Sequence, residues 1–272
     1  MTCSNDENGK TRCPWLWLIR RPAMQLMLAD REQFASLPAG PFRRAWIELL
    51  LFSLAWGLLN IGLWDLATRG ISSASGLPLV PAGLVLLAGG MWLYRRSLVA
   101  LGKLAAPKET AGAALVGALV AVFWLLVLLD LPGPLPSTGM VLPAGLQWLR
   151  PLPWYRVLLL SPIWGAWAML ITCQFCRPDR QSSPAIAALA TGCGPASAAM
   201  AMVVPLAGSL YYFNHLSWWQ STIPASAIVA ATVGGWLFCN RFGGLRREAL
   251  LAVNVLTQIV FTVAYLVNRS FP

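Results

Sequence analysis

Ionisable residues other than arginine are scarce in this chain of 272 residues. It has one histidine, ten aspartate and glutamate residues and only 11% charged residues in total. The long apolar stretches have almost no charge at their centres, which argues against a proton-coupled carrier, because such a carrier needs an ionisable group within the membrane. The only histidine, His215, is expected on the face opposite the candidate site, which disfavours a hydrolytic triad. No P-loop or dinucleotide-binding glycine pattern occurs.

Long apolar stretches dominate what the chain does have. Hydrophobic residues make up 57% of it, and the mean hydropathy is +0.63. A helix needs about 20 apolar residues to cross a hydrocarbon layer of about 30 Å. The stretches cover residues 46–66, 79–94, 111–131, 157–176, 185–213, 222–240 and 249–267. They predict an all-α, polytopic transmembrane helix bundle of about seven spans. In the longest stretch, Gly192, Gly194 and Pro195 are expected to permit a kink or close packing.

Basic residues gather on alternate connections between these stretches. If the N-terminus is cytoplasmic, sixteen lysine and arginine residues lie on the cytoplasmic side, and the opposite side holds only Arg69, Arg150, Arg156 and Arg269. The positive-inside rule therefore predicts a cytoplasmic N-terminus in a multi-pass protein of a cell inner membrane. The net charge of +10 is then mainly a topology signal. No folded polar domain is expected that could present it to a nucleic acid.

Residues 1–45 are expected to form a cytoplasmic N-terminal segment ahead of a transmembrane domain at 46–272. Within the segment, Pro22 can open a short helix, because proline is favoured in the first helical turn. Met27 and Phe34 recur at helical spacing opposite Asp30 and Arg31. We therefore expect an interfacial helix along the membrane surface, within residues 15–36. A helix that docks a partner protein is the alternative.

Two polar features remain open to more than one interpretation. Cys173 and Cys176 form a CxxC pair, which suits a soft-metal or redox site, although a zinc site needs about four ligands. No cysteine lies on a predicted outer connection, so we favour buried thiols and expect no structural disulfide. Asn254 and Gln258 share one helical face. They can bind a ligand or a neighbouring helix, and we favour the second.

Residues 241–258, which include Gly243, Gly244, Glu248 and Gln258, resemble a known C-terminal signature. It belongs to cobalamin synthase, the adenosylcobinamide-GDP ribazoletransferase family, whose pattern has Gly-Gly, Thr-Gly-Asp and a span with a glutamate. Upstream, three segments are similar to family segments in the same order, at residues 89–94, 108–112 and 164–169. The resemblance implies a membrane enzyme of the last step of cobalamin nucleotide-loop assembly. That enzyme joins α-ribazole to a nucleotide-bearing corrinoid, adenosylcobinamide-GDP, with loss of GMP and with Mg²⁺ as cofactor.

The acidic motif of that family is largely replaced here. The family's His-x-Asp-Gly-x-x-Asp stretch corresponds to residues 92–98, which contain two arginines and no acid. Glu109 and Glu248 keep acids at other matching positions and are candidate Mg²⁺ ligands. Fork-shaped guanidinium groups can also hold a substrate phosphate without a metal. The phosphate candidates, which equally suit a positive-inside topology, are Arg95, Arg96, Arg246 and Arg247.

Two classes of function therefore stay open. One is a transferase that retains activity through the remaining acids. The other is a non-catalytic membrane subunit or ligand-binding pseudoenzyme, alone or as a homo-oligomer. A small-solute transporter is a third class, and no intramembrane charge supports it.

The orientation predicts a labelling pattern in intact cells. A cysteine introduced at Ser137 should react with an impermeant thiol reagent, because its connection is expected outside, whereas native Cys3 and Cys13 should stay unlabelled. Lysed cells serve as the control, since they expose both sides to the reagent. Labelling of Cys3 or Cys13 from outside would reverse the orientation.

Overall fold

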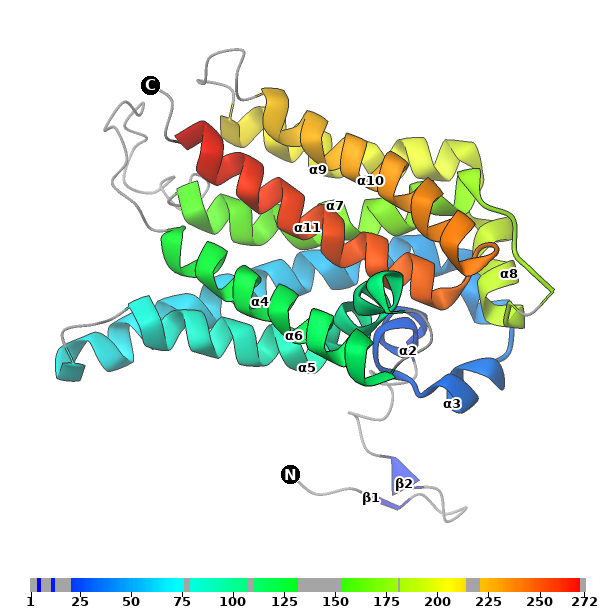
Figure 1. Ribbon diagram of the computed structural model, residues 1–272, viewed down its shortest axis with the longest axis horizontal. Helices are drawn as coiled ribbons and strands as arrows, with labels where there is room; N and C mark the ends of the chain where they lie inside the picture. Colours follow the sequence, from blue (N-terminus) through cyan, green and yellow to red (C-terminus); the bar gives the residue numbers. More distant parts are fainter. Residues whose placement is uncertain are drawn as a thin grey trace.

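The chain folds as an all-α bundle in the computed structural model, which describes residues 4–5, 11–12, 21–75, 79–106, 110–131, 153–180, 182–213 and 221–269 (Figure 1). Short elements come first: strands β1 (Ser4–Asn5) and β2 (Thr11–Arg12), helices α2 (Pro22–Leu28) and α3 (Arg31–Ala35), and the 3₁₀ helix η1 (Gly40–Arg44). The longer helices follow as α4 (Ala45–Ser75), α5 (Leu79–Ala105), α6 (Thr110–Asp130), α7 (Pro153–Phe175), α8 (Pro184–Gly192), α9 (Pro195–Phe213), α10 (Thr222–Phe242) and α11 (Arg247–Arg269). The predicted fold class is confirmed.

Six helices of the described residues are long and apolar enough to cross a membrane: α4, α6, α7, α9, α10 and α11. Helix α5 is similarly long and packs along α6, α4 and α11, but its second half carries Arg95, Arg96 and Lys103. Large apolar side chains such as Leu51, Leu115 and Val203 point outward, away from the bundle. A soluble protein would bury such side chains, whereas lipid solvates them. The chain is therefore a multi-pass membrane protein.

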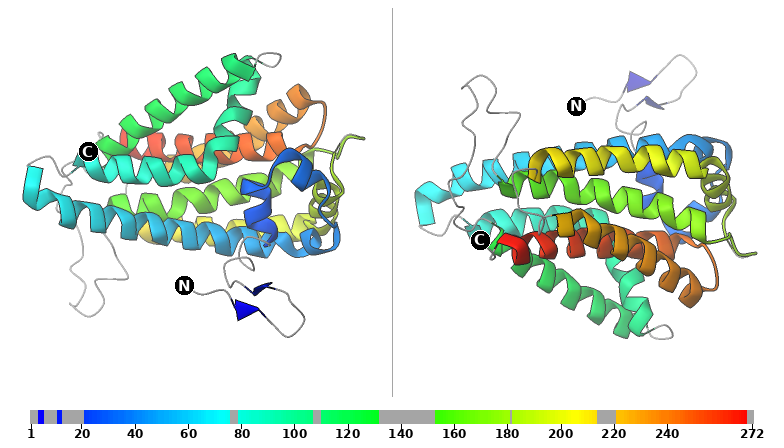
Figure 2. Two further views of the ribbon diagram at one scale, coloured as in Figure 1. Left: turned by 90° about the horizontal axis from the view of Figure 1, so that it is seen from below. Right: turned by 90° about the horizontal axis from the view of Figure 1, so that it is seen from above.

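Helices α7 and α11 form the centre of the bundle. Helix α7 contacts α4, α9, α10 and α11, and in Figure 2 it lies between its neighbours in both views. Of the residues in its span, 89% are buried, against 33% in the span of α6. Trp164 of α7 is fully buried and stacks edge-on against Trp167, with ring centroids 5.5 Å apart. Two central helices thus position every other span.

The stretch predicted as one long span, residues 185–213, is two helices. Helix α8 ends at Gly192, and α9 begins at Pro195, in the first-turn position that proline favours. A Cβ at Gly192 would collide with the backbone of Arg43 in η1, so glycine permits this close approach. The expectation of close packing at this glycine is confirmed, but the kink is a full break between two helices. Helix α8 packs across η1 at one end of the bundle.

The N-terminal segment docks on the bundle through α2. This helix begins at Pro22 as predicted, and Leu26 and Met27 are buried against α4 and α5. It ends at Leu28, and a capping box between Asp30 and Gln33 starts α3. The single interfacial helix that we expected is therefore two short helices. The apolar face of α2 packs against α4 and α5 and does not lie open on the membrane surface.

Helices α7 and α10 are joined covalently. A disulfide connects Cys176, just after α7, with Cys239 near the end of α10. The expectation of no structural disulfide is therefore wrong, because helix crossing brings two thiols together that lie 63 residues apart. Cys173 remains a free, buried thiol, so the CxxC pair does not act as one unit. Other predictions lie outside the described residues, namely those for Cys3, Cys13, Glu109, His215 and the connection at 132–152.

A close crossing between α5 and α6 predicts a test of packing. Gly102→Ala should lower the free energy of unfolding by about 1–3 kcal/mol, because its Cβ would overlap the backbone of Ala113. Thermal unfolding of the detergent-purified variants would measure the change. Gly62→Ala in α4 is the matched control, since nothing lies within 4 Å of its Cβ. An equal melting temperature for both variants would contradict this crossing.

Candidate functional site

A cavity of about 590 Å³ opens at one end of the bundle, between α3, α5, the start of α8 and the start of α11. Two acidic and six basic side chains line it: Asp30, Glu248, Arg31, Arg95, Arg96, Lys103, Arg246 and Arg247. We call this the basic cavity, and its end of the molecule the basic end. It contains all four predicted phosphate candidates and Glu248. The resulting excess of positive charge favours an anionic ligand.

Arg247 uses its guanidinium group to hold helix α2. Its nitrogens donate to three backbone carbonyls at the end of that helix, those of Leu26 at 2.7 Å, Ala29 at 2.7 Å and Gln25 at 3.2 Å. The group also lies 4.5 Å from the ring centroid of Phe34 in α3. The last carbonyls of a helix lack partners within it, and a cation satisfies them well. Arg247 therefore fixes the N-terminal helices to the last span.

Arg96 holds the same junction from α5. It donates to the backbone carbonyl of Ala29 and to the carboxylate of Asp30. Its Nε is buried and lacks a partner among the described residues. Arg96 and Arg247 thus meet at the short link between α2 and α3, which forms one wall of the basic cavity. Both line the cavity, but most of their donors already serve the fold.

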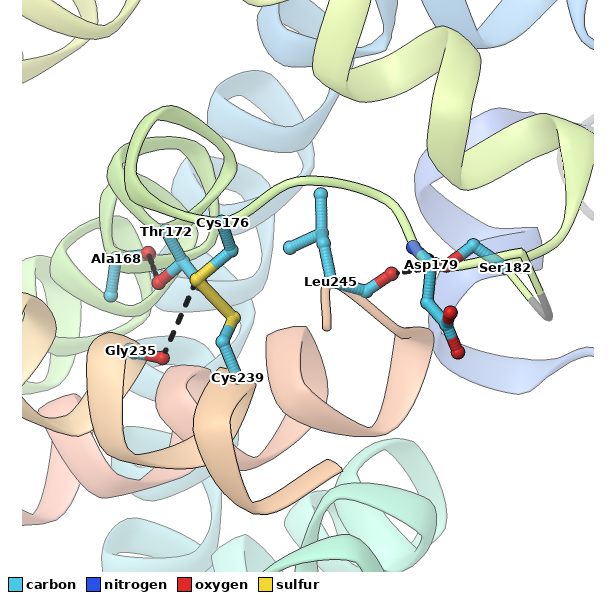
Figure 3. The surroundings of a disulfide bond; sticks show 8 residues. All are labelled: Ala168, Thr172, Cys176, Asp179, Ser182, Gly235, Cys239 and Leu245. Atoms are coloured by element: carbon cyan, nitrogen blue, oxygen red, sulfur yellow. Dashed lines mark hydrogen bonds between the residues drawn. A yellow bond between two sulfur atoms is a disulfide. The ribbon is translucent and has the colours of Figure 1, made fainter. Parts of the chain in front are cut away.

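Arg246 belongs to a second wall, formed by two neighbouring connections. Its guanidinium donates to the carboxylate of Asp179 at 2.6 Å. The backbone N–H of Leu245 donates to the carbonyl of Arg177 at 2.9 Å, and the hydroxyl of Ser182 donates to the carbonyl of Leu245 at 2.6 Å. Figure 3 shows the connection that leaves Cys176 passing Leu245 to reach Asp179 and Ser182, beside the disulfide. This wall is fixed by covalent and hydrogen bonds together.

Three cations of the basic cavity are uncommitted. Arg31, Arg95 and Lys103 have no hydrogen bond or ion pair within the part of the chain that the structure describes. The carboxylate of Glu248 likewise has no such partner there, and it lies in the first turn of α11. These side chains are therefore the ones free to meet a ligand. The sequence analysis identified Arg95 and Glu248 as candidates. It missed Arg31 and Lys103, because both lie outside the segments 92–98 and 241–258 that resemble family motifs.

Asn254 and Gln258 lie elsewhere, in the centre of the bundle. Each is 2% exposed, the amide of Gln258 donates to the side-chain oxygen of Asn254, and Nδ2 of Asn254 lies 3.5 Å from the sulfur of Met169. A Cβ on Gly165 would lie 2.6 Å from the same Asn254 oxygen. Glycine thus brings α7 close to these amides. Their environment favours the helix-contact interpretation, and neither residue lines the basic cavity.

The donor set suits an anion better than a protein-held metal ion. Within the described residues, no group of three histidine, cysteine, aspartate or glutamate side chains could hold a metal. Asp30 is paired with Arg96, which leaves Glu248 as the uncommitted carboxylate of the cavity. Mg²⁺ can bind through one or two carboxylates when phosphates and waters complete its shell. Any such ion would therefore have to arrive with a phosphate ligand.

The comparisons with known proteins add no relative. No family model, no curated protein and no solved structure matches the chain.

The role of Arg247 predicts a proteolysis result. Arg247→Gln should release α2, because it removes three charge-assisted hydrogen bonds that together stabilise docking by about 2 kcal/mol or more. Trypsin should then cut after Arg31 at least about tenfold faster. Arg241→Gln is the control, because this exposed cation at the same end makes no hydrogen bond or ion pair with α2 among the described residues. Equal cleavage rates in both variants would refute the anchoring role.

Proposed function

We propose that this membrane protein binds a phosphate-bearing ligand in the basic cavity. The observation that carries the proposal is the lining of six cations and two acids, with three of the cations uncommitted. A phosphate group offers several oxygens, each able to accept from a guanidinium or ammonium donor. Arg95 and Arg31 would supply planar, two-pronged donors, and Lys103 a compact charge. Arg246, held by Asp179, would form a fixed rim of the site.

We further propose that the basic end faces the cytoplasm of a cell with an inner membrane. The residues counted on the cytoplasmic side by charge bias include all six cations of the cavity. Arg156, counted on the opposite side, bonds to Tyr212 at the other end of the bundle. The segregation of charge in space agrees with the positive-inside pattern. The ligand would accordingly come from the cytoplasm or from the inner leaflet.

The resemblance to the ribazoletransferases suggests which phosphate compound to test first. Two matching segments that lie far apart in the chain, residues 92–98 and 241–258, both contribute side chains to the basic cavity. Adenosylcobinamide-GDP carries a diphosphate, which needs nearby positive charge. A nucleotide-bearing corrinoid is therefore the proposed ligand. The acid-free stretch at 92–98 favours binding without catalysis, as in a pseudoenzyme or a ligand-sensing membrane subunit.

A second candidate function is the transfer reaction itself. Glu248 supports it, because this uncommitted carboxylate faces the same cavity. Together with Glu109 it would hold Mg²⁺ against the ligand's diphosphate, so that the ion neutralises charge as GMP leaves. Purified protein given adenosylcobinamide-GDP, α-ribazole and Mg²⁺ would then form product. Glu248→Gln should abolish that product while leaving metal-free ligand binding intact.

The binding proposal predicts a charge-dependent affinity. In Arg95→Gln/Lys103→Gln, affinity for GMP, GDP or adenosylcobinamide-GDP should fall about ten- to a hundredfold, because two charged hydrogen bonds are lost. Calorimetry in detergent, with and without EDTA, would measure it. Binding should weaken as salt rises, since accessible charges are screened over about 8–10 Å at physiological ionic strength. Arg241→Gln removes a charge outside the cavity and should bind normally.

The outcomes separate the two candidate functions. Binding that persists in EDTA supports arginine-held phosphate, whereas binding that strictly needs Mg²⁺ favours the transferase. Vesicles with phosphate-headgroup lipids provide a second arm, because competition by such vesicles but not by neutral ones identifies a lipid source of the phosphate. An absence of binding to every probe would refute the proposal and leave a structural membrane subunit.

A further inference from the structure

The disulfide lies at the root of one wall of the basic cavity. Cys176 and Cys239 are 8% and 5% exposed, and their Cα atoms are 6.2 Å apart. A short chain segment leads from each cysteine to the cavity, and we call these two segments the paths. From Cys176 the chain reaches Ser182 and Ser183 of the lining, and from Cys239 it reaches Arg246. Thus no more than seven residues separate either sulfur from a cavity side chain.

The two paths touch each other along their length. Beyond the hydrogen bonds of Leu245 and the ion pair of Arg246, Gly244 packs so closely that its Cβ would lie 2.8 Å from the Cβ of Asp179. Gly243 and Gly244 both have positive φ, at 74° and 137°, which lets the chain turn sharply from α10 into α11. Figure 3 shows Leu245 and Asp179 of the two paths near the sulfur bridge. The position of Arg246 therefore depends on how the two helix ends are held together.

We infer that the Cys176–Cys239 disulfide is a redox control on the basic cavity, which binds its phosphate ligand more tightly when oxidised. The inference rests on the proposed function. With the bond intact, α7 and α10 end at a fixed separation, and Asp179 holds Arg246 at the rim. After reduction, hydrogen bonds, the Arg246–Asp179 ion pair and the packing of Gly244 hold this wall, with no covalent bond between the helix ends. Each of these contacts is weak in net terms, so the end of α10 can move with Arg246.

The chemistry is an ordinary thiol–disulfide exchange with a cellular dithiol. One thiolate of the dithiol attacks a sulfur of the Cys176–Cys239 bond, which forms a mixed disulfide and releases the other cysteine as a thiol. The second thiol of the dithiol then attacks, which frees the remaining cysteine and leaves the dithiol oxidised. Two electrons and two protons pass to the protein. An oxidised dithiol reverses the reaction.

The neighbouring free cysteine on the α8–α9 link does not compete in this exchange. Burial raises the pKa of the Cys193 thiol to about 11, because the thiolate loses solvation between the helices. At neutral pH this side chain is therefore protonated and a poor nucleophile. Exposed Phe175 and Asn240 flank the bridge, so a local opening of these helix ends admits a reductant.

A redox titration of ligand affinity tests this inference. GDP binding should weaken at least about fivefold when the purified protein is reduced with dithiothreitol, with the disulfide state verified by alkylation and mass spectrometry. Cys239→Ser should bind as weakly as the reduced protein and stop responding to the reductant. Cys193→Ser is the matched control and should keep the full redox response. Equal GDP affinity in verified oxidised and reduced protein would overturn the inference.

A readout without ligand separates this inference from the proposed function. Arg180 is exposed in the same connection, and trypsin should cut after it faster in the reduced protein. Faster cutting with no GDP binding in either state would support the disulfide's control of this wall and refute the phosphate ligand. Unchanged cutting together with unchanged binding would refute the disulfide's control of this wall. Thermal unfolding of both forms would establish that the bundle stays folded throughout.

Discussion

The contact between Arg247 and the end of helix α2 organises the basic end of the molecule. It joins the first described helix to the last, across more than 200 residues of chain. The last carbonyls of a helix lack a full set of helical partners, and the guanidinium donates to three carbonyls at the end of α2, of which that of Gln25 also accepts from the backbone N–H of Ala29. Arg96 approaches the same link from α5. The cavity exists because these two cations hold α2 and α3 over the helix ends.

Positive charge has two uses at this end, and the structure separates them. Arg96, Arg246 and Arg247 are engaged by carbonyls or carboxylates, whereas Arg31 and Arg95 are not, within the described residues. A cation that already has partners gives up those contacts when it binds a ligand, so it adds less affinity. Uncommitted cations are therefore better ligand donors. Scaffold arginines still contribute by raising the local potential.

Inside the membrane, several polar groups are paired with one another within the bundle. Asn254 and Gln258 pair with each other, and Trp164 donates to Ser209 at 3.1 Å. An unpaired polar group in hydrocarbon costs several kcal/mol, so these bonds help to specify which helix faces meet. The small residue Gly165 makes the approach of α7 possible. The central helices are thereby fixed, and the ends of the bundle are free to form a site.

The amino-acid pattern alone predicted the membrane-spanning class, the approximate helix positions, the start of α2 at Pro22 and the grouping of arginines at one end. These follow from hydropathy, length and local conformation, which each segment carries alone. Other features could be seen only in the folded bundle: the break at Cys193 and Gly194, the docking of α2, the Cys176–Cys239 bond, and which cations have partners. Each of these depends on how distant helices cross. Side-chain pairing across such crossings is set by packing geometry, which leaves no periodic signal in one chain.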